Sequence, residues 1–537
     1  MTTSSKEITN LNRPQNFTTL LRKMATGTMI SRILGLVRIF ALGYALGISG
    51  TSDAYNLANT TPNIIHDLVL GGVLAATFVP VFTKRLTSLP LDEAWEGISA
   101  VVTLSAVVLI VATFIFELAA PIIVSAYTIG SSSNLSGQSH TLAVDFLRLF
   151  VPQLLLYGFI SIASALLNSS NKFTPVTLAP IFNNVMVIFI LIEFGILEHH
   201  PSPGLLLSNS RYIWLIGLGT SAGVAAQFLA LIPSLRKSNL HLKWNWNPKH
   251  EAVSEIRRLS GWTFGFVAIN QIALFVILSL AARSAKGTVT AYTYAYTFFQ
   301  LPYWMFAVSV SVTLAPELSK LWTLDDKESF KKRLSRGISS INALIFPAAV
   351  GYLVLSTSIV SLILNHGAAS TAGIVLTAQA LRFLALGLPG FCIFMLTTRA
   401  FFSMQNAKTV FWIYVVENSL NVVLAIVLVV PLGIRGIALS ISIAYTLSAF
   451  LSIVLMRNRL GGLGLKRLFR LTLRVLILTL ITGLVAATAS SVFSTSTTIG
   501  NLADVILGVV AGIVTYGGLA GILAKPNGSA VKMDTKV

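Results

Sequence analysis

The sequence predicts an all-α polytopic membrane protein with fourteen transmembrane helices, and two observations lead to this fold class. Hydrophobic residues make up 54% of the 537 residues and charged residues only 11%, with a mean hydropathy of +0.79. A soluble domain carries about 25% charged residues. The apolar residues also come in runs of about 20, the length of a helix that crosses about 30 Å of hydrocarbon. A barrel is excluded because its strands would be about 10 residues long and alternating.

The helices are expected in three groups, which define the domain organisation. Residues 1–20 form a disordered cytoplasmic tail, 21–235 an N-lobe of six helices, 236–258 a cytoplasmic linker, 259–456 a C-lobe of six helices, 457–525 a final helix pair, and 526–537 a second cytoplasmic tail. The expected helices lie near 24–47, 60–84, 95–126, 140–167, 175–196, 212–235, 260–283, 290–319, 336–364, 375–402, 409–431, 435–456, 471–493 and 500–523.

Charges in the loops predict that both termini are cytoplasmic. Loops after even-numbered helices hold most of the lysines and arginines, including Lys84, Arg236 and the run from Arg457 to Arg474. Loops after odd-numbered helices hold few, and none occurs in 48–59, 127–139, 365–374 and 494–499. Cytoplasmic loops of membrane proteins are enriched in these residues. The same rule explains the net charge of +19, so no nucleic-acid partner is expected.

The chain resembles itself at an offset of about 235 residues. Asn171-Lys172-Phe173-Thr174 recurs as Asn406-Ala407-Lys408-Thr409, and in each copy a further asparagine follows twelve residues after the first, at Asn183 and Asn418. Each copy spans six helices, an even number, so both copies have the same orientation. Parallel repeats place a substrate cavity between two lobes. We therefore expect two pseudo-symmetric six-helix lobes and a C-terminal helix pair outside the repeat.

Two arginines of the first helix lie where charge is costly. If the helix enters the membrane near residue 25, Arg32 lies about 10 Å deep and Arg38 about 20 Å deep. Arg32 can extend back to the headgroups, but Arg38 sits near the midplane, where an arginine costs about 2.5–3.5 kcal/mol on insertion scales. We favour an anion site in a cavity for Arg38. The alternative is a fixed ion pair with Asp67 or Asp53.

Polar side chains recur on one face of the second helix, at Asn56, Asn59, Asn63, His66 and Asp67. Pro62 and the pair Gly71-Gly72 allow this helix to bend. The pattern indicates either a moving gate or a polar contact between helices without motion.

No catalytic, metal or cofactor site is expected. The chain has no Gly-x-x-x-x-Gly-Lys-Ser/Thr loop, and neither the single Cys392 nor the seven histidines have the spacing of metal ligands. Energy for transport would come from Na⁺, H⁺ or the membrane potential. Glu417 is the carboxylate best placed for ion coupling, and Asn418 and Asn421 either ligate a cation or bridge helices.

The run Ser31-Arg32-Ile-Leu-Gly35-Leu-Val-Arg38, with Asp53-Ala54, Pro62-Asn63 and Gly72-Val-Leu-Ala-Ala-Thr-Phe-Val-Pro80, resembles the signature of the MurJ (MviN) family. Members are lipid II flippases of the multidrug/oligosaccharidyl-lipid/polysaccharide exporter superfamily. Supporting matches follow at Gln300-Leu-Pro302, Ala315-Pro316 and Arg399 to Lys408. The resemblance covers residues 20–525 and implies fourteen helices arranged as six, six and two.

The resemblance implies a transporter, not an enzyme, in the bacterial cytoplasmic membrane. Its substrate would be the undecaprenyl-pyrophosphate-linked disaccharide-pentapeptide, flipped to the outer leaflet by alternating access. The final helix pair would form a lipid groove, and membrane lipids and cell-wall synthesis proteins are candidate partners. Expected substrate-binding residues are Arg32, Arg38, Asp53, Asn63, Ser31 and His66, and expected gating residues are Gly35, Pro62 and Gly72.

Two positions depart from the family pattern, because many members carry an arginine where this chain has His66 and Thr297. The cavity is therefore less basic than the family pattern. An exporter of another polyprenyl-pyrophosphate-linked glycan remains an alternative, as does a multidrug or cation antiporter of the superfamily, which would favour acids in the lobes. A membrane glycosyltransferase would need a carboxylate in a sizeable outer loop, where loop 197–211 offers Glu198. A scaffold for wall assembly is a further alternative.

Overall fold

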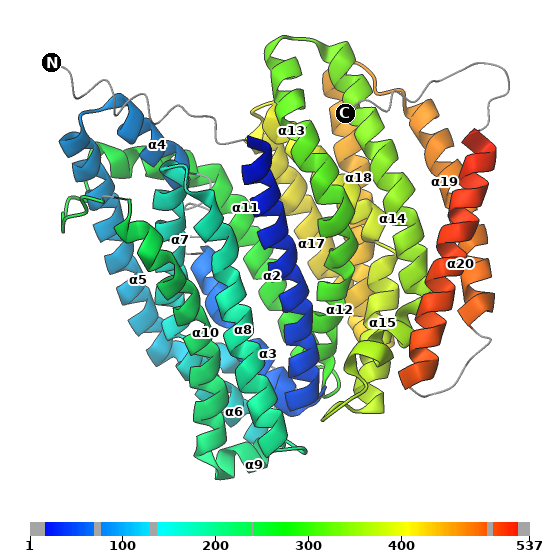
Figure 1. The fold of residues 1–537 in the computed structure, drawn as a ribbon, viewed down its shortest axis with the longest axis horizontal. Coiled ribbons are helices and arrows are strands. Elements are labelled where there is room, and N and C mark those ends of the chain that lie inside the picture. The colour runs from blue at the N-terminus through cyan, green and yellow to red at the C-terminus, as the bar shows by residue number, and fades with distance from the viewer. Residues whose placement is uncertain (1–16, 69–76, 129–136, 239, 491–497, 525–537) are drawn as a thin grey trace. The chain divides into compact units, whose positions relative to one another are not determined.

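The computed structural model describes residues 17–68, 77–128, 137–238, 240–490 and 498–524, and these residues form helices and loops without a β-strand (Figure 1). The all-α polytopic fold is thereby confirmed. Twelve of the described helices are long and apolar enough to cross a membrane, or thirteen spans if one bent helix pair is counted. The expected number of fourteen stays a prediction, because the helix expected at 60–84 includes residues 69–76, which lie outside the described residues.

The chain divides into two compact units, and the first comprises residues 1–47, 54–126 and 136–271. Within it α2 packs along α8, and a Cβ atom at Gly195 would lie 2.5 Å from the Tyr44 ring. The helices that belong wholly or mostly to this unit are α2 (Phe17–Leu46), α3 (Gly50–His66), α4 (Val79–Ser88), α5 (Leu91–Thr128), α6 (Gln138–Phe150), α7 (Pro152–Ser169), α8 (Phe173–Leu197), α9 (Pro203–Ser208), α10 (Ser210–Arg236) and α11 (Glu251–Ala282).

The second unit comprises residues 48–53, 127–135 and 272–537. Within it α19 and α20 pack side by side and both contact α14 (Figure 1). Its helices are α12 (Thr288–Pro302), the π-helical turn η3 (Tyr303–Ala307), α13 (Val308–Thr323), α14 (Lys327–Leu364), α15 (Thr371–Ala385), α16 (Leu388–Ser403), α17 (Ala407–Leu432), α18 (Ile434–Leu460), α19 (Leu465–Ser490) and α20 (Thr498–Ala524).

The order of the elements recurs along the chain at the offset of the sequence repeat. Helices α5 and α14 each have 38 residues and begin at Leu91 and Lys327. Helices α8 and α17 begin at Phe173 and Ala407. The interrupted helix α6–α7 corresponds in the same way to α15–α16. These element lengths agree with the repeat read from the sequence.

Two expected spans, at 140–167 and 375–402, are each built from two helices. Pro152 opens α7 and Pro389 lies in the first turn of α16. A proline lacks the N–H that would continue the preceding helix, so each span is interrupted there. The break between α15 and α16 bends the pair by 52°.

Helix α14 begins nine residues before the expected span. The side chain of Asp326 caps it by accepting a hydrogen bond of 3.0 Å from the Ser329 amide, which lowers the pKa of that carboxyl. The first turns are rich in lysine and arginine, so hydropathy gave no signal for them. These turns carry basic side chains beyond the apolar part of the helix.

Candidate functional site

A group of polar side chains in the first unit surrounds Arg38, the residue on which the expected anion site depends. We call it the Arg38 cluster. Its members come from four helices and the residue after one of them: Arg38 of α2, Asn63 and His66 of α3, Asp67, Tyr157 and Ser161 of α7, and Gln271 of α11.

Arg38 is partly buried and interacts electrostatically with the hydroxyl group of Tyr157. The same hydroxyl is hydrogen-bonded to the side chain of Asn63 and donates to Gln153 Oε1 at 3.5 Å. Gln153 in turn donates to Ser221 Oγ at 2.9 Å. Arg38 forms no ion pair with any residue that the structure describes. Its guanidinium therefore lies beside neutral polar groups, without a neutralising carboxylate.

Asp67, one of the two acids considered as a fixed partner of Arg38, is engaged elsewhere. Its Oδ1 lies 3.1 Å from His66 Nδ1, and its Oδ2 accepts a hydrogen bond of 2.7 Å from Gln271. The other ring nitrogen of His66 lies 3.2 Å from Ser161 Oγ, and its ring lies 6.0 Å from that of Tyr157. Both carboxyl oxygens of Asp67 are therefore engaged by His66 and Gln271.

The remaining expected residues of α2 lie about one to two turns before Arg38. Arg32 is exposed, and the carbonyl of Ser31 accepts a hydrogen bond of 3.2 Å from Asn184 of α8. Gly35 has open space where a Cβ atom would lie, so packing does not require a glycine there. Asn184 fixes the backbone of α2 beside Arg32 and leaves the turn at Gly35 unobstructed.

The other expected gating residues are only partly described. Pro62 is buried within α3, which ends at His66 and continues in a short π-helical turn. Gly72 lies outside the described residues. The structure therefore describes only one of the two positions at which a bend is expected, and gating stays a prediction.

Asp53 belongs to the second unit and is 3% exposed. Its Oδ2 accepts from the Gly287 amide at 2.6 Å, and its Oδ1 accepts at 2.8 Å from both the amide and the hydroxyl of Thr290. These donors lie at the start of α12, where the first N–H groups of a helix have no partner within it. Substrate binding by Asp53 stays a prediction, and these contacts favour a structural role.

The expected ion-coupling residues lie together on α17, where Glu417, Asn418 and Asn421 are 2%, 5% and 4% exposed. Asn418 Nδ2 donates to the Tyr414 carbonyl at 2.9 Å, and Asn421 Oδ1 accepts from Ser440 of α18 at 2.9 Å. Asn421 thus makes a hydrogen bond between helices, which was the alternative to cation binding, whereas Asn418 bonds within α17. Ion coupling by these residues stays a prediction.

Glu417 itself lies in a cluster of buried tyrosines. The hydroxyl groups of Tyr292, Tyr296, Tyr414 and Tyr445 all lie in the electrostatic field of its carboxyl group. The side chain of Asn418 is hydrogen-bonded to that carboxyl group. A buried acid among phenols and amides is a chemically plausible place to exchange a proton or hold a cation.

An apolar groove of about 500 Å³ lies in the second unit between α14, α19 and α20. Five glycines contribute to its walls, Gly351, Gly483, Gly508, Gly512 and Gly517. Tyr516 donates a hydrogen bond of 2.9 Å to the Ala343 carbonyl. Small residues let these helices approach closely. The family resemblance implied a lipid groove on the final helix pair but not the wall that α14 supplies.

Sequence reasoning missed the members of the Arg38 cluster outside the first two helices, Tyr157, Ser161 and Gln271, and also Gln153, which is hydrogen-bonded to Tyr157. Gln153 and Tyr157 are four residues apart in an otherwise apolar span, and Gln271 lies in another. Residues four apart share one helical face. The polar face formed by Gln153 and Tyr157 was the available signal.

Comparison with known proteins gives, along most of the chain, the family that the sequence motifs resemble. Residues 42–507 match the family model described as lipid II flippase MurJ. The probable lipid II flippase MurJ of Thermotoga maritima is 27% identical over 419 residues, which cover 78% of this chain and 81% of that protein. The lipid II flippase MurJ of Burkholderia cenocepacia is 25% identical over 437 residues, covering 80% and 82%.

Solved structures share the fold. A lipid II flippase MurJ in the inward closed conformation matches with a TM-score of 0.76 and 23% identity, over 93% of this chain and 99% of that chain. An inward-facing multidrug resistance MATE family transporter of the MOP superfamily matches with a TM-score of 0.68 and 15% identity, over 82% and 98%.

Proposed function

Because the chain belongs to the lipid II flippase MurJ family, we propose that it moves lipid II from the cytoplasmic to the outer leaflet of the bacterial cytoplasmic membrane. The observation that carries the proposal is the guanidinium of Arg38, which lies among neutral polar side chains without a carboxylate partner in the described residues. Such a group binds a phosphate oxygen pair in a forked geometry. It is the chemistry that a pyrophosphate headgroup needs.

Transport requires the headgroup to avoid hydrocarbon, because a charged pyrophosphate–sugar group cannot enter it unaided. In the proposed mechanism Arg38 holds the pyrophosphate, while Arg32 and Ser31, on the same helix, guide its entry. Tyr157 and Asn63 supply hydroxyl and amide groups for the headgroup and keep the guanidinium oriented. Access then alternates between leaflets, with bending at Gly35 and Pro62. No covalent bond changes, so the protein acts as a transporter and not as an enzyme.

The apolar groove between α14, α19 and α20 suits the prenyl chain of the same substrate. A hydrocarbon chain gains no energy from leaving the bilayer, so the groove guides it rather than binding it tightly. Gly512 lines the groove, and the nearest atom to a Cβ there is 3.6 Å away in Thr482. Gly512→Leu is therefore expected to fill the groove and slow flipping without unfolding the protein.

We further propose that Glu417 couples flipping to an ion gradient. Its burial and its hydrogen bond to Asn418 support a role that depends on gaining and losing a charge. The test is Glu417→Gln in proteoliposomes under an imposed Na⁺ gradient, pH gradient or membrane potential, each applied alone. One of these gradients should raise the flipping rate of the wild-type protein, and the same gradient should leave the flipping rate of the variant unchanged. An unchanged response in the variant would remove Glu417 from the coupling.

The loop charges support a location with both termini in the cytoplasm. A cysteine introduced in the N-terminal tail should be labelled only from the cytoplasmic side, and one at residue 202 in the outer loop only from outside. Labelling of the tail from outside would overturn this orientation. Proteins of cell-wall synthesis are the proposed partners, since they consume the product on the outer side.

The substrate proposal is tested in cells depleted of their own flippase. Arg38→Ala should abolish the exposure of lipid II on the outer leaflet, and Arg38→Lys should restore it only in part, because lysine retains the charge and loses the fork. A matched control is Arg211→Ala, which removes an exposed arginine in the first turn of α10. Protein levels are compared by immunoblot. Normal lipid II exposure with Arg38→Ala would defeat the site assignment, and restoration of a different polyprenyl-pyrophosphate glycan would change the substrate.

A further inference from the structure

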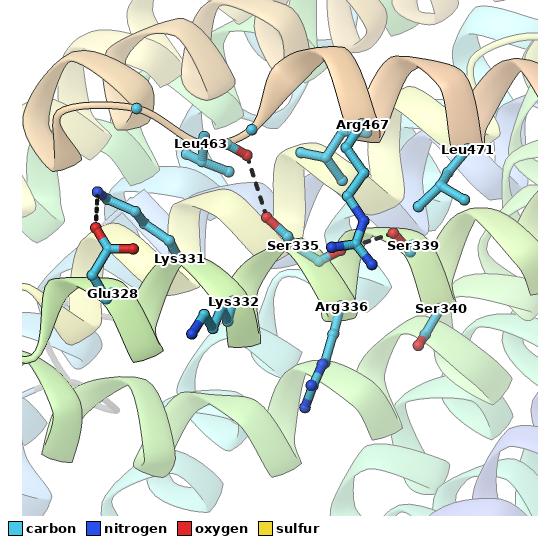
Figure 2. Close-up of a pocket in the computed structure, with 13 residues that line it drawn as sticks. Glu328, Lys331, Lys332, Ser335, Arg336, Ser339, Ser340, Leu463, Arg467 and Leu471 are labelled. Atoms are coloured by element: carbon cyan, nitrogen blue, oxygen red, sulfur yellow. Dashed lines mark hydrogen bonds and ion pairs between the residues drawn. The ribbon is translucent and has the colours of Figure 1, made fainter. Parts of the chain in front are cut away.

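A basic cavity of about 1160 Å³ lies in the second unit where α14 and α19 begin. Four basic side chains line it, Lys331, Lys332 and Arg336 of α14 and Arg467 of α19, with Glu328 as the acid among its described lining residues. Figure 2 shows the Arg467 side chain extending from α19 toward α14. The cavity therefore gathers positive charge from two helices.

Only one of these charges is neutralised within the cavity. Lys331 Nζ lies 2.6 Å from Glu328 Oε1 (Figure 2). Lys332, Arg336 and Arg467 form no ion pair with any residue of the described ranges. Elsewhere on the same turn, Arg333 is paired with Glu317 at 2.7 Å, so the lack of partners is a property of the cavity.

Hydroxyl groups accompany the unpaired cations. Ser335, Ser339 and Ser340 of α14 line the cavity, and Figure 2 shows Ser335 and Ser339 on the side of α14 that faces α19. Ser335 donates to the Leu463 carbonyl at 3.4 Å and Ser339 donates to the Ser335 carbonyl at 2.9 Å, so the hydrogens of these two hydroxyl groups are already engaged. Of the three serines, Ser340 is the one that makes no hydrogen bond to a described residue, and its hydroxyl can donate to a ligand. Guanidinium, ammonium and hydroxyl groups together are the donors that a phosphate group attracts.

The position of the cavity identifies the ligand as a lipid. Leu463, Leu468 and Leu471 form part of its lining, and the apolar run of α19 starts at Leu471. On α14 the apolar groove begins at Leu344, about one helical turn beyond Ser340. The same two helices thus carry a basic cavity and, further along, an apolar one. A ligand with a phosphate headgroup and hydrocarbon chains matches that order.

We propose that this cavity binds the phosphate-bearing headgroup of an anionic membrane lipid, on the side that the loop charges predict to be cytoplasmic. The chemistry is shared by a resident glycerophospholipid and by a polyprenyl pyrophosphate. Lys332, Arg336 and Arg467 contact the phosphate oxygens, and the lipid chains lie along α14 and α19 in the bilayer. The site does not depend on the proposed flipping activity, because it would stabilise the packing of α19 on α14 in any conformation.

The test compares lipid binding by purified protein in a neutral detergent, measured by native mass spectrometry. The variant Lys332→Gln/Arg336→Gln/Arg467→Gln removes the unpaired charges of the cavity. The control Lys327→Gln/Arg333→Gln/Arg470→Gln removes three charges from the same two helices outside the cavity. The probes are phosphatidylglycerol, undecaprenyl pyrophosphate, phosphatidylcholine and inorganic pyrophosphate.

Basic residues near a membrane surface contribute about fivefold in affinity each, so the cavity variant should bind the anionic lipid about 100-fold more weakly. The control should change its affinity by less than about tenfold. Preference for phosphatidylglycerol identifies a resident phospholipid, and preference for undecaprenyl pyrophosphate identifies the transport substrate; either result supports the site. Equal losses in both variants, or binding of inorganic pyrophosphate as tight as that of the lipids, would overturn it.

Discussion

Replacing Asp53 by asparagine removes the negative charge on which three hydrogen-bond donors at the start of α12 converge. Those donors are the amides of Gly287 and Thr290 and the Thr290 hydroxyl, at 2.6 to 2.8 Å. A hydrogen bond to a charged group is worth about 1 kcal/mol more than a neutral one. For three such bonds, Asp53→Asn is expected to lower the free energy of unfolding by about 3 kcal/mol. For a unit of about 280 residues this corresponds to roughly 6–12 °C in apparent Tm.

The assay is thermal unfolding of the purified protein in detergent. The fraction of the protein that stays monodisperse is measured at each temperature. The matched control is Asp92→Asn, an exposed acid in the first turn of α5 that interacts mainly with the helix dipole. Asp92→Asn should lower the free energy of unfolding by about 0.3–1 kcal/mol. If Asp53→Asn keeps the apparent Tm of the wild type and abolishes flipping, the structural role is refuted and Asp53 is a substrate ligand.

Two further comparisons use pairs of residues that differ in one property. Arg85 has a side chain that is 5% exposed and lies 3.8 Å from both Glu255 and Glu251, whose side chains are 13% and 88% exposed. Glu255→Ala should therefore lower the free energy of unfolding by about 3 kcal/mol, and Glu251→Ala by less than about 1 kcal/mol, as judged by apparent Tm; equal effects would contradict the burial argument. Gly436→Ala should lower the free energy of unfolding by about 1–3 kcal/mol, and with it the apparent Tm, because its Cβ would meet a backbone carbonyl of α17. Gly35→Ala should leave the free energy of unfolding unchanged or raise it by up to about 1 kcal/mol. Slower flipping by this stable variant would indicate gating at Gly35. A loss of stability would contradict the open space found beside Gly35.

The sequence predicted the helices well wherever an apolar run sets their length. The span expected at 175–196 is α8, Phe173–Leu197, and the one at 409–431 is α17, Ala407–Leu432. The first turns of α14 were not predicted, because their lysines and arginines extend beyond the apolar segment. Local hydropathy describes the bilayer crossing and not the helix that continues past it.

The candidate site was predictable in part. Arg38 stands out because a charge in an apolar run is costly. Its neighbour Tyr157 was not predicted, because the packing of α7 beside it is a tertiary property that no local pattern reports. For Asp53 the family resemblance implied substrate binding, which stays a prediction; the hydrogen bonds that its oxygens accept from the start of α12 are a tertiary contact that no local pattern reports.

The central claim is that the Arg38 guanidinium binds the pyrophosphate of the transported lipid. The most direct measurement is the flipping rate in proteoliposomes of two lipids with the same prenyl chain and sugar, one linked by pyrophosphate and one by a single phosphate. The wild type should flip the pyrophosphate lipid faster, and Arg38→Ala should remove most of that difference, since a double-mutant comparison isolates the contact between the two groups. An equal preference in wild type and variant would contradict the claim.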